Sequence, residues 1–246
     1  MQRLVGLIRR CAEDYNMIES GDRIGVGVSG GKDSLALLLL LSELRKYNNN
    51  SFSLEAITVD IGLGMDYSGI AEFCRKIDVP FTLVETQIGP VIFDYRKEKN
   101  PCSMCAKMRR GALNQALLDR GLNKLALGHH YDDAVETFMM SLLYEGRISC
   151  FQPVTNLDRS GIVQIRPMLY VHEQTIDNFA VRENLPVLTN RCPVDRQTKR
   201  EEIKKLVYEL SATYPELKER IFGAMQRFPL PEWEPMGRYK RPKDNT

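Results

Sequence analysis

Short apolar runs alternate with amphipathic stretches in the first part of the chain. The runs typical of buried strands cover residues 23–29, 54–60, 80–86 and 123–128. Between and after them, apolar side chains recur at helical spacing in residues 32–47, 67–77, 104–120 and 132–144. Strands that alternate with crossover helices are typical of a parallel, doubly wound sheet. The pattern therefore predicts an α/β fold.

The pattern is less regular beyond Gly146. We expect a hairpin or loop around Gly161, followed by helices at residues 172–183, 197–210 and 215–225. We interpret residues 1–20 as an N-terminal helical segment. The proline-rich and basic residues 226–246 are expected to form an irregular tail. No obvious linker divides the chain, so the sequence predicts one domain over residues 1–246, with a helical C-terminal extension.

The composition is that of an ordinary globular protein, with 43% hydrophobic and 27% charged residues. The formal net charge of +2 conceals a local concentration of basic side chains. Between positions 96 and 110, six basic residues accompany the single acid Glu98: Arg96, Lys97, Lys99, Lys107, Arg109 and Arg110. Such a patch suits a polyanion, although a solvated surface is the commoner reason for a charge run.

Nothing in the sequence favours a membrane. The N-terminal residues include Arg3, Arg9 and Arg10 and lack the apolar core of a signal peptide. The longest apolar run, Leu35–Leu41, is too short to cross a bilayer. We therefore expect a cytoplasmic protein. Its six cysteines fit a reducing compartment, in which close cysteine pairs more often bind metal or do redox chemistry than form disulfides.

The first predicted strand runs into the loop "SGGKDS", from Ser29 to Ser34. In an open parallel sheet, ligands bind beyond the carboxyl ends of the strands, where this loop must lie. Gly30 and Gly31 let the backbone turn tightly and expose amides, and Lys32 adds positive charge at a helix N-terminus. The spacing is neither that of a Walker A loop nor that of a dinucleotide fingerprint. A plain glycine-rich turn is the alternative, but this combination favours a phosphate site.

These residues resemble the PP-loop of ATP pyrophosphatases, which cleave ATP between its α and β phosphates and adenylate a substrate. The resemblance implies that Ser29, Gly30, Gly31, Lys32, Asp33 and Ser34 bind ATP. It also implies that Asp60, at the end of the second strand, and the segment "GHHYDD" after the fourth strand face the nucleotide.

The residues at these two strand ends have a physical interpretation of their own. Asp60 could meet a ribose or a metal-bound phosphate, and Gly128 would allow a close approach. Asp132 and Asp133 form a carboxylate pair of the kind that holds Mg²⁺. The alternative for the pair is helix capping, which we expect more of Asp132 than of Asp133. His129 could equally be a packed histidine or one that faces the ligand.

Three cysteines stand where predicted helices begin: Cys102 and Cys105 as a close pair, and Cys192 far along the chain. The spacing leaves three readings open. Zinc would need a fourth ligand, which Cys150 or His130 could supply. A [4Fe–4S] cluster on three thiolates leaves one iron with an open position. A redox dithiol is the third reading, because a Cys-x-x-Cys pair at a helix start has a lowered thiol pKa.

The order "SGGKDS", "PCSMCAKMRRG", "GHHYDDAVET" and "NRCP" resembles that of the tRNA 2-thiocytidine synthetases, over roughly residues 24–200. The resemblance implies that Cys102, Cys105 and Cys192 hold a [4Fe–4S] cluster and that the chain thiolates a tRNA pyrimidine, with an anticodon-loop cytidine as the expected base. It implies roles for Lys32, Asp33 and Asp133 in handling ATP and Mg²⁺, and for Arg109 in neutralising phosphate.

The resemblance further implies that a sulfide or persulfide donor takes part, and that the chain forms a homodimer, as relatives commonly do. Two alternatives remain. One is a zinc-containing PP-loop enzyme that adenylates its substrate for a different nucleophile. The other is a nucleotide-binding iron–sulfur sensor without turnover.

Overall fold

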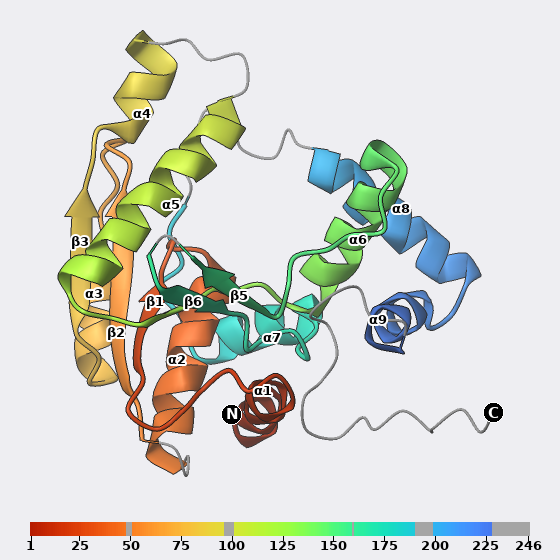
Figure 1. Cartoon of the computed structure of the whole chain (residues 1–246), viewed down its shortest axis with the longest axis horizontal. Helices are drawn as coiled ribbons and strands as arrows, with labels where there is room; N and C mark the ends of the chain where they lie inside the picture. Colours follow the sequence, from red (N-terminus) through yellow and green to blue (C-terminus); the bar gives the residue numbers. More distant parts are fainter. Residues whose placement is uncertain (48–50, 96–100, 159, 190–198, 228–246) are drawn as a thin grey trace.

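The structure is a computed structural model that describes residues 1–47, 51–95, 101–158, 160–189 and 199–227. Its helices lie on both sides of a central sheet (Figure 1). The strands are β1 Arg23–Gly27, β2 Ser53–Asp60, β3 Phe81–Glu85, β4 Lys124–Ala126, β5 Val154–Leu157 and β6 Ile162–Ile165. The helices are α1 Gln2–Asp14, α2 Lys32–Tyr47, α3 Ser68–Lys76, α4 Ile88–Pro90, the π-helix η1 Val91–Tyr95, α5 Pro101–Asp119, α6 Tyr131–Glu145, α7 Glu173–Arg182, α8 Lys199–Thr213 and α9 Leu217–Arg227.

The strand order is β3-β2-β1-β4-β6-β5. All neighbours are parallel except β5 and β6, which form an antiparallel hairpin around Gly161. The predicted doubly wound sheet is confirmed, and of the two alternatives expected around Gly161 the structure has the hairpin. The chain proceeds from β1 towards one edge and returns to β4 on the other side of β1, so the topological switch point lies between β1 and β4. The carboxyl ends of these two strands are therefore the expected ligand site.

The alternation of residues in β1 explains how two helices cover it. Ile24 and Val26 are fully buried in the main hydrophobic cluster with α2. Gly25 and Gly27 face the other way, where an added Cβ would lie 3.0 Å from Leu117 Cδ2 and 3.3 Å from Leu113 Cδ2. The absence of side chains at these two positions lets α5 pack closely over the strand. This brings the first turns of α5 over the switch point.

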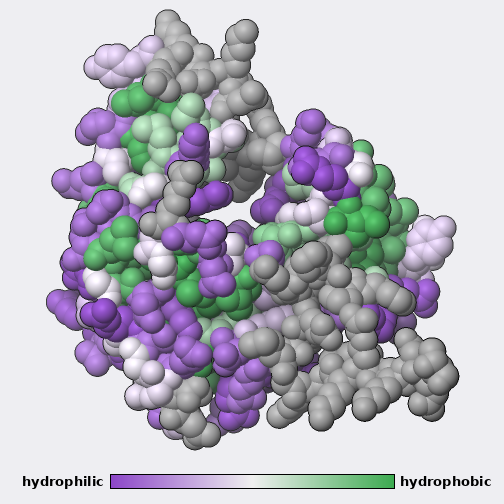
Figure 2. Space-filling view, viewed as in Figure 1, coloured by the Kyte–Doolittle hydropathy of each residue, from purple (hydrophilic) through white to green (hydrophobic). Residues whose placement is uncertain are grey.

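The helices from both ends of the chain join one core. Leu4 and Ile8 of α1, Phe179 of α7 and Phe222 of α9 all belong to the hydrophobic cluster that buries α2. In Figure 1, α8 and α9 pack beside α6, away from α5. The space-filling view is hollowed between α5 on one side and α6 with α8 on the other (Figure 2).

One predicted helix boundary was wrong. We expected α5 to begin at Met104, but it begins at Pro101, so Cys102 also lies within its first turn. Residues 185–189 look strand-like in sequence but are not in a strand. The helix α9 ends at Arg227, and the expected irregular tail beyond it, residues 228–246, lies outside the described residues. None of the helices in the described ranges is long and apolar enough to cross a membrane.

Candidate functional site

The loop between β1 and α2 is held by its own serines. Ser29 donates its amide to Ser34 Oγ at 3.1 Å, and the two hydroxyl oxygens lie 3.3 Å apart. Ser34 Oγ in turn donates to the carbonyl of Gly31 at 2.9 Å. Gly30 adopts a φ of +87°, a conformation that side chains disfavour. The loop is therefore a preformed turn at the N-terminus of α2, as the sequence predicted.

The strand-like residues 185–189 hold this loop from outside. The amide of Leu188 donates to the carbonyl of Gly30 at 2.9 Å. An added Cβ on Gly30 would lie 3.0 Å from Leu188 Cδ1. Leu188 stands four positions before Cys192 in the sequence, which itself lies outside the described residues. The stretch that leads to the third predicted thiolate is thus bonded directly to the phosphate loop.

Gly128 permits a backbone contact at the switch point. A Cβ at this position would lie 3.1 Å from the carbonyl carbon of Asp33 and 3.1 Å from the amide nitrogen of Ser34. Both atoms belong to the first turn of α2, so neither can move aside cheaply. The chain after β4 therefore packs directly on the phosphate loop. The predicted glycine has a structural reason that does not require a nucleotide.

Lys32 is surrounded by carboxylates. Its Nζ lies 2.8 Å from Asp177 Oδ1, 3.1 Å from Asp33 Oδ1 and 3.2 Å from Glu173 Oε1. Partial burial opposes the charge, but the hydrogen bond to Asp177 and the negative charges of Asp33 and Glu173 outweigh it and raise the pKa of Lys32. Glu173 and Asp177 both come from α7, and the sequence analysis did not identify either. Lys32 is a fixed cation in this arrangement.

Of the two acids of "GHHYDD", we expected Asp132 rather than Asp133 to cap α6, but the structure shows the reverse. Asp133 accepts from the amide of His130 at 3.0 Å, and His130 Nδ1 accepts from the amide of Asp133 at 3.3 Å, which is a capping box on α6. Asp132 does not cap its own helix. Its Oδ2 accepts from the amide of Glu173 at the start of α7, at 2.7 Å, and its Oδ1 pairs with Lys218 at 2.5 Å. Asp132 is therefore a structural link between helices.

Asp133 has further partners. Its Oδ1 lies 3.3 Å from Arg200 Nη1, and its Oδ2 lies 3.4 Å from His130 Nε2. His130 Nε2 is also 3.9 Å from Asp33 Oδ1. A buried histidine thus stands between the two carboxylates that were predicted to handle ATP.

Asp60 ends β2, as expected, and is half-buried. Its Oδ1 accepts hydrogen bonds from the amide of Gly62 and from the Tyr67 hydroxyl, both at 3.1 Å. Burial and the Asp60 charge raise the pKa of Tyr67 to about 12, so the phenol stays a donor. The Asp60 carboxylate is thereby held at the carboxyl end of β2.

A cavity of about 330 Å³ opens at the switch point. Ser29 and Arg109 line it from the phosphate loop and from α5, and His129 and Gln164 line it from the ends of β4 and β6. Its remaining wall is largely apolar and is formed by residues such as Val28, Ile57, Val59, Ala106, Leu113, Leu125 and Leu127. An apolar chamber with a few converging polar groups beside a phosphate loop has the character of a small-molecule site.

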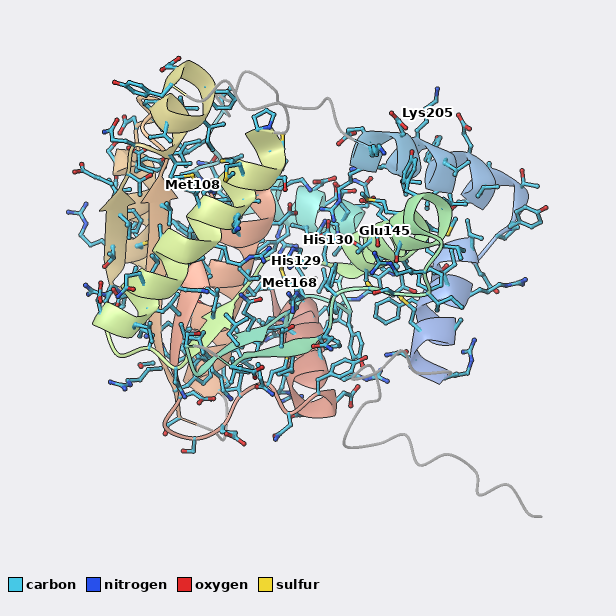
Figure 3. All side chains as sticks on the ribbon, turned by 45° about the horizontal axis from the view of Figure 1, so that its top comes forward. Met108, His129, His130, Glu145, Met168 and Lys205 are labelled. Carbon is cyan, nitrogen blue, oxygen red and sulfur yellow. The ribbon has the colours of Figure 1, made fainter. Side chains whose placement is uncertain are left out.

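The half-buried His129 and the buried Arg166 form a pair beside this cavity. Arg166 Nε donates to His129 Nδ1 at 3.2 Å, and the His129 ring stacks on Phe151 with centroids 4.8 Å apart. Figure 3 shows His129 and His130 where α6 begins, between Met108 on α5 and Glu145 at the far end of α6. From the sequence, His129 could be either a packed histidine or one that faces the ligand, and Arg166 was not predicted to be a site residue. A basic residue inside the apolar run "VQIRPML" was the available signal.

Cys102 and Cys105 lie one helical turn apart on α5. Cys102 is exposed, whereas Cys105 packs against a small apolar cluster that contains Val59, Ile88 and Ile92. A spacing of three residues places both thiols on one face of the helix, and Arg109, four residues after Cys105, follows on that face. Within the described ranges, no group of three or more His, Cys, Asp or Glu side chains is arranged to hold a metal ion. Cys192 lies outside those ranges.

Cys150 was considered as a further metal ligand. Its Sγ donates to the carbonyl of Ala134 at 3.4 Å, and burial raises the pKa of the thiol to about 12. Metal ligation requires a thiolate. These features favour a packing role for Cys150.

The basic residues divide into exposed side chains and side chains that form ion pairs inside the site. Lys107 and Arg110 are exposed on α5, where Arg110 also lines the cavity, and Lys205 is exposed on α8. By contrast, Arg200 pairs with Asp133, and Lys204 pairs with Glu173 at 2.7 Å. Part of the basic run that begins α8 therefore stabilises the site from within. Arg96, Lys97 and Lys99 lie outside the described residues.

The comparison with known sequences is clear. The PP-loop domain family model matches residues 5–210. The tRNA-cytidine(32) 2-sulfurtransferase of Pelobacter propionicus is 36% identical over 229 residues, which cover 91% of this chain and 85% of that protein. The protein of the same name from Nitrosomonas eutropha is 34% identical, and the alignment covers 97% of this chain and 77% of that one.

One solved structure agrees with these sequence matches. The U34-tRNA thiolase NcsA from Methanococcus maripaludis, with its [4Fe–4S] cluster, superposes with a TM-score of 0.74 at 25% sequence identity. The superposition covers 91% of this chain and 77% of that chain. The similarity is thus one of fold as well as of sequence.

The contact at Gly128 predicts the effect of a single methyl group. Gly128→Ala should destabilise the chain by roughly 1–3 kcal/mol, because the new Cβ must displace backbone. The same displacement should distort the loop and weaken ATP binding. Urea unfolding and calorimetric titration with ATP measure the two effects. Gly111→Ala on α5 is the control, because nothing lies within 4 Å of its added Cβ. Equal stability and ATP affinity in Gly128→Ala would contradict the account.

The carboxylates around Lys32 predict a change in ATP affinity. Asp177→Asn should tighten ATP binding about fivefold, because it removes a negative charge that competes with phosphate for Lys32 and that is worth roughly 1 kcal/mol at a partly exposed site. The gain should shrink as salt is added. Glu183→Gln, at the other end of α7, is the control and should leave the affinity unchanged. Weaker ATP binding in Asp177→Asn would show that the pair positions Lys32 for the nucleotide instead.

Proposed function

Because the chain belongs to the PP-loop family and, within it, to the tRNA-cytidine(32) 2-sulfurtransferases, we propose that it catalyses the ATP-dependent thiolation of a tRNA cytidine. One observation carries the proposal. Ser29 of the loop and Arg109 of α5 line the same cavity at the switch point, and Cys102 and Cys105 precede Arg109 on one face of that helix. The cavity therefore lies between the nucleotide loop and the helix that carries the cysteine pair.

The chemistry has two steps. The C2 carbonyl oxygen of cytidine is a poor leaving group. In the first step it attacks the α-phosphorus of ATP, a P–O bond forms, the bond to the β-phosphate breaks, and pyrophosphate leaves. In the second step sulfur at the oxidation level of sulfide attacks C2, the C2–O bond breaks, and AMP departs with that oxygen. Loss of the sulfur-bound proton leaves the thiocarbonyl, so no oxidant or reductant is consumed.

The described residues supply groups for the first step. The amides of Gly30 and Gly31 and the N-terminus of α2 suit the phosphates of ATP, and the Ser34 hydroxyl would join them after releasing the carbonyl of Gly31. Lys32 would meet them after leaving its carboxylate partners. The apolar part of the cavity suits the nucleotide base.

Mg²⁺ would complete the nucleotide site. Asp133 and Asp33 lie on either side of His130 near the loop, and carboxylates are the ligands that Mg²⁺ prefers. Asp60 at the end of β2 is the other candidate. Arg109 of α5 lines the same cavity as Ser29 of the loop, and from there it would neutralise phosphate charge.

The thiols suit the second step. Cys102 and Cys105 present two sulfur ligands on one face of α5, and Cys105 stands on an apolar floor. We propose that they hold a [4Fe–4S] cluster together with Cys192. When bound, such a cluster supplies an iron with an open coordination position that can hold sulfur for delivery. Arg109 would lie between the cysteine pair and the nucleotide and keep the two reacting partners in one chamber.

The substrate is a polyanion. The exposed side chains Lys107 and Arg110 of α5 and Lys205 of α8 support a contact with the tRNA backbone, whose strength should fall as salt rises. The printed names of the relatives specify cytidine 32, and we propose the same base here. Substrates of this kind are available in the cytoplasm, where we place the reaction. The sulfide or persulfide donor and the homodimer stay predictions from the resemblance.

The proposal is tested by anaerobic purification with metal analysis and a thiolation assay. The protein should be brown and contain about four irons per chain. Cys102→Ala and Cys192→Ala should both lose the iron and the formation of 2-thiocytidine, detected by mass analysis of digested tRNA. Cys74→Ala is the control, since Cys74 is buried in the main core. A colourless protein with one zinc, or a cluster that survives both substitutions, would contradict the proposal.

A further inference from the structure

His129 is a histidine whose hydrogen-bonding direction is fixed by its neighbour. Arg166 Nε–H donates to His129 Nδ1 at 3.2 Å. A guanidinium has no acceptor, so the lone pair of Nδ1 is occupied and the proton of the neutral ring must sit on Nε2. The stacking on Phe151 also fixes the ring plane. Because His129 lines the cavity, the ring has one donor left for a ligand.

We propose that His129 donates Nε2–H to an α-phosphate oxygen during adenylyl transfer, and that Arg166 is the positioning residue that fixes its tautomer. The inference rests on the proposed function, because it needs ATP in the cavity. Two contacts place the ring there. Gly128, the preceding residue, packs on the backbone of Asp33 and Ser34, and the cavity that His129 lines is also lined by Ser29.

Arg166 is anchored as a positioning residue should be. Its Nη1 donates to the carbonyl of Gln152 at 2.5 Å and to Thr155 Oγ1 at 3.1 Å, and its Nη2 lies 3.5 Å from Gln164 Oε1. Its guanidinium carbon stands 5.0 Å from the centre of the Phe151 ring. These partners come from β5, β6 and the segment before them, so the sheet itself sets the direction of Nε–H.

The charge of Arg166 is unusual for its burial. Only 6% of the residue is exposed, and none of the described carboxylates forms an ion pair with it. Burial lowers the pKa of Arg166 to about 10, which leaves it charged at neutral pH. A buried cation without a carboxylate partner lowers the stability of the folded chain. Here the positive charge of Arg166 would strengthen the His129 donor towards an anion without touching the anion itself.

Burial and the positive charge of Arg166 together keep His129 neutral. Burial, and then the charge of Arg166, lowers the pKa of His129 to about 4, with smaller effects in the same direction from Arg200 and His130. Asp133 opposes them. A neutral donor does not change its charge between pH 6 and pH 8, so its contribution should be constant over that range.

Nuclear magnetic resonance tests the tautomer without any catalytic assay. The chain has three histidines, so a sample labelled with nitrogen-15 histidine gives three ring systems, assigned with His129→Gln and His172→Gln. We expect His129 in the wild-type chain to show only the Nε2–H tautomer and no protonation down to pH 5. Arg166→Met should raise the His129 pKa towards its ordinary value and mix the tautomers. An Nδ1–H tautomer, or protonation near pH 6.5, in the wild-type chain would overturn the inference.

Kinetics test the donor itself. His129→Ala should lower the kcat of pyrophosphate release about 100-fold, the size expected for one lost donor to a developing charge, and leave the KM for ATP within about threefold. His129→Gln can still donate from a similar position, so its kcat should be at least tenfold higher than that of His129→Ala. His172→Gln is the control, because His172 stands at the N-cap position of α7, makes no side-chain capping hydrogen bond there and does not line the cavity.

Equal kcat values for His129→Ala and the wild type, or no advantage of Gln over Ala, would overturn the donor role. If the wild-type chain formed no thiolated tRNA at all, the proposed function would fail. The tautomer measurement would still decide whether Arg166 fixes His129.

Discussion

The site depends on a contact between two stretches of backbone. The chain leaving β4 passes so close to the first turn of α2 that a side chain at position 128 would press on the backbone of Asp33 and Ser34. This contact joins the phosphate loop to the segment that carries His129, His130 and Asp133. Because α2 is buried in the main core and β4 lies inside the sheet, neither partner can move alone. The candidate catalytic groups therefore inherit the rigidity of the whole fold.

Charge is distributed unevenly around that contact. On one side, α7 directs Glu173 and Asp177 at Lys32, and Asp132 holds the start of α7 in place. On the other side, the cavity is bordered by Arg109, and Arg166 stands buried behind it. This arrangement would draw an anionic ligand into the cavity, and under the proposed function Lys32 would leave its carboxylate partners when the phosphates of ATP compete for it. The acidic side and the basic side nearly balance, which is consistent with the small net charge of +2.

Hydrophobic periodicity and turn chemistry were sufficient to predict the parallel sheet, its flanking helices and the tight turn between β1 and α2, because these depend on local pattern. The start of α5 was misplaced because Pro101 looks like a stop signal, although proline is well tolerated in a first helical turn. Asp132 and Asp133 could not be distinguished from sequence, since one of them caps a helix distant in the chain. Glu173, Asp177, Leu188 and Arg166 were missed for the same reason. Their roles exist only after remote segments meet.

The most direct test of the central claim follows a single oxygen atom. A tRNA whose cytidine carries oxygen-18 at C2 is incubated anaerobically with the protein, Mg-ATP and sulfide, and the nucleotide product is analysed by mass. The account predicts one AMP and one pyrophosphate for each 2-thiocytidine formed, with the oxygen-18 in the AMP. Unlabelled AMP, or ADP with free phosphate, would contradict adenylation of the base and with it the role assigned to the loop.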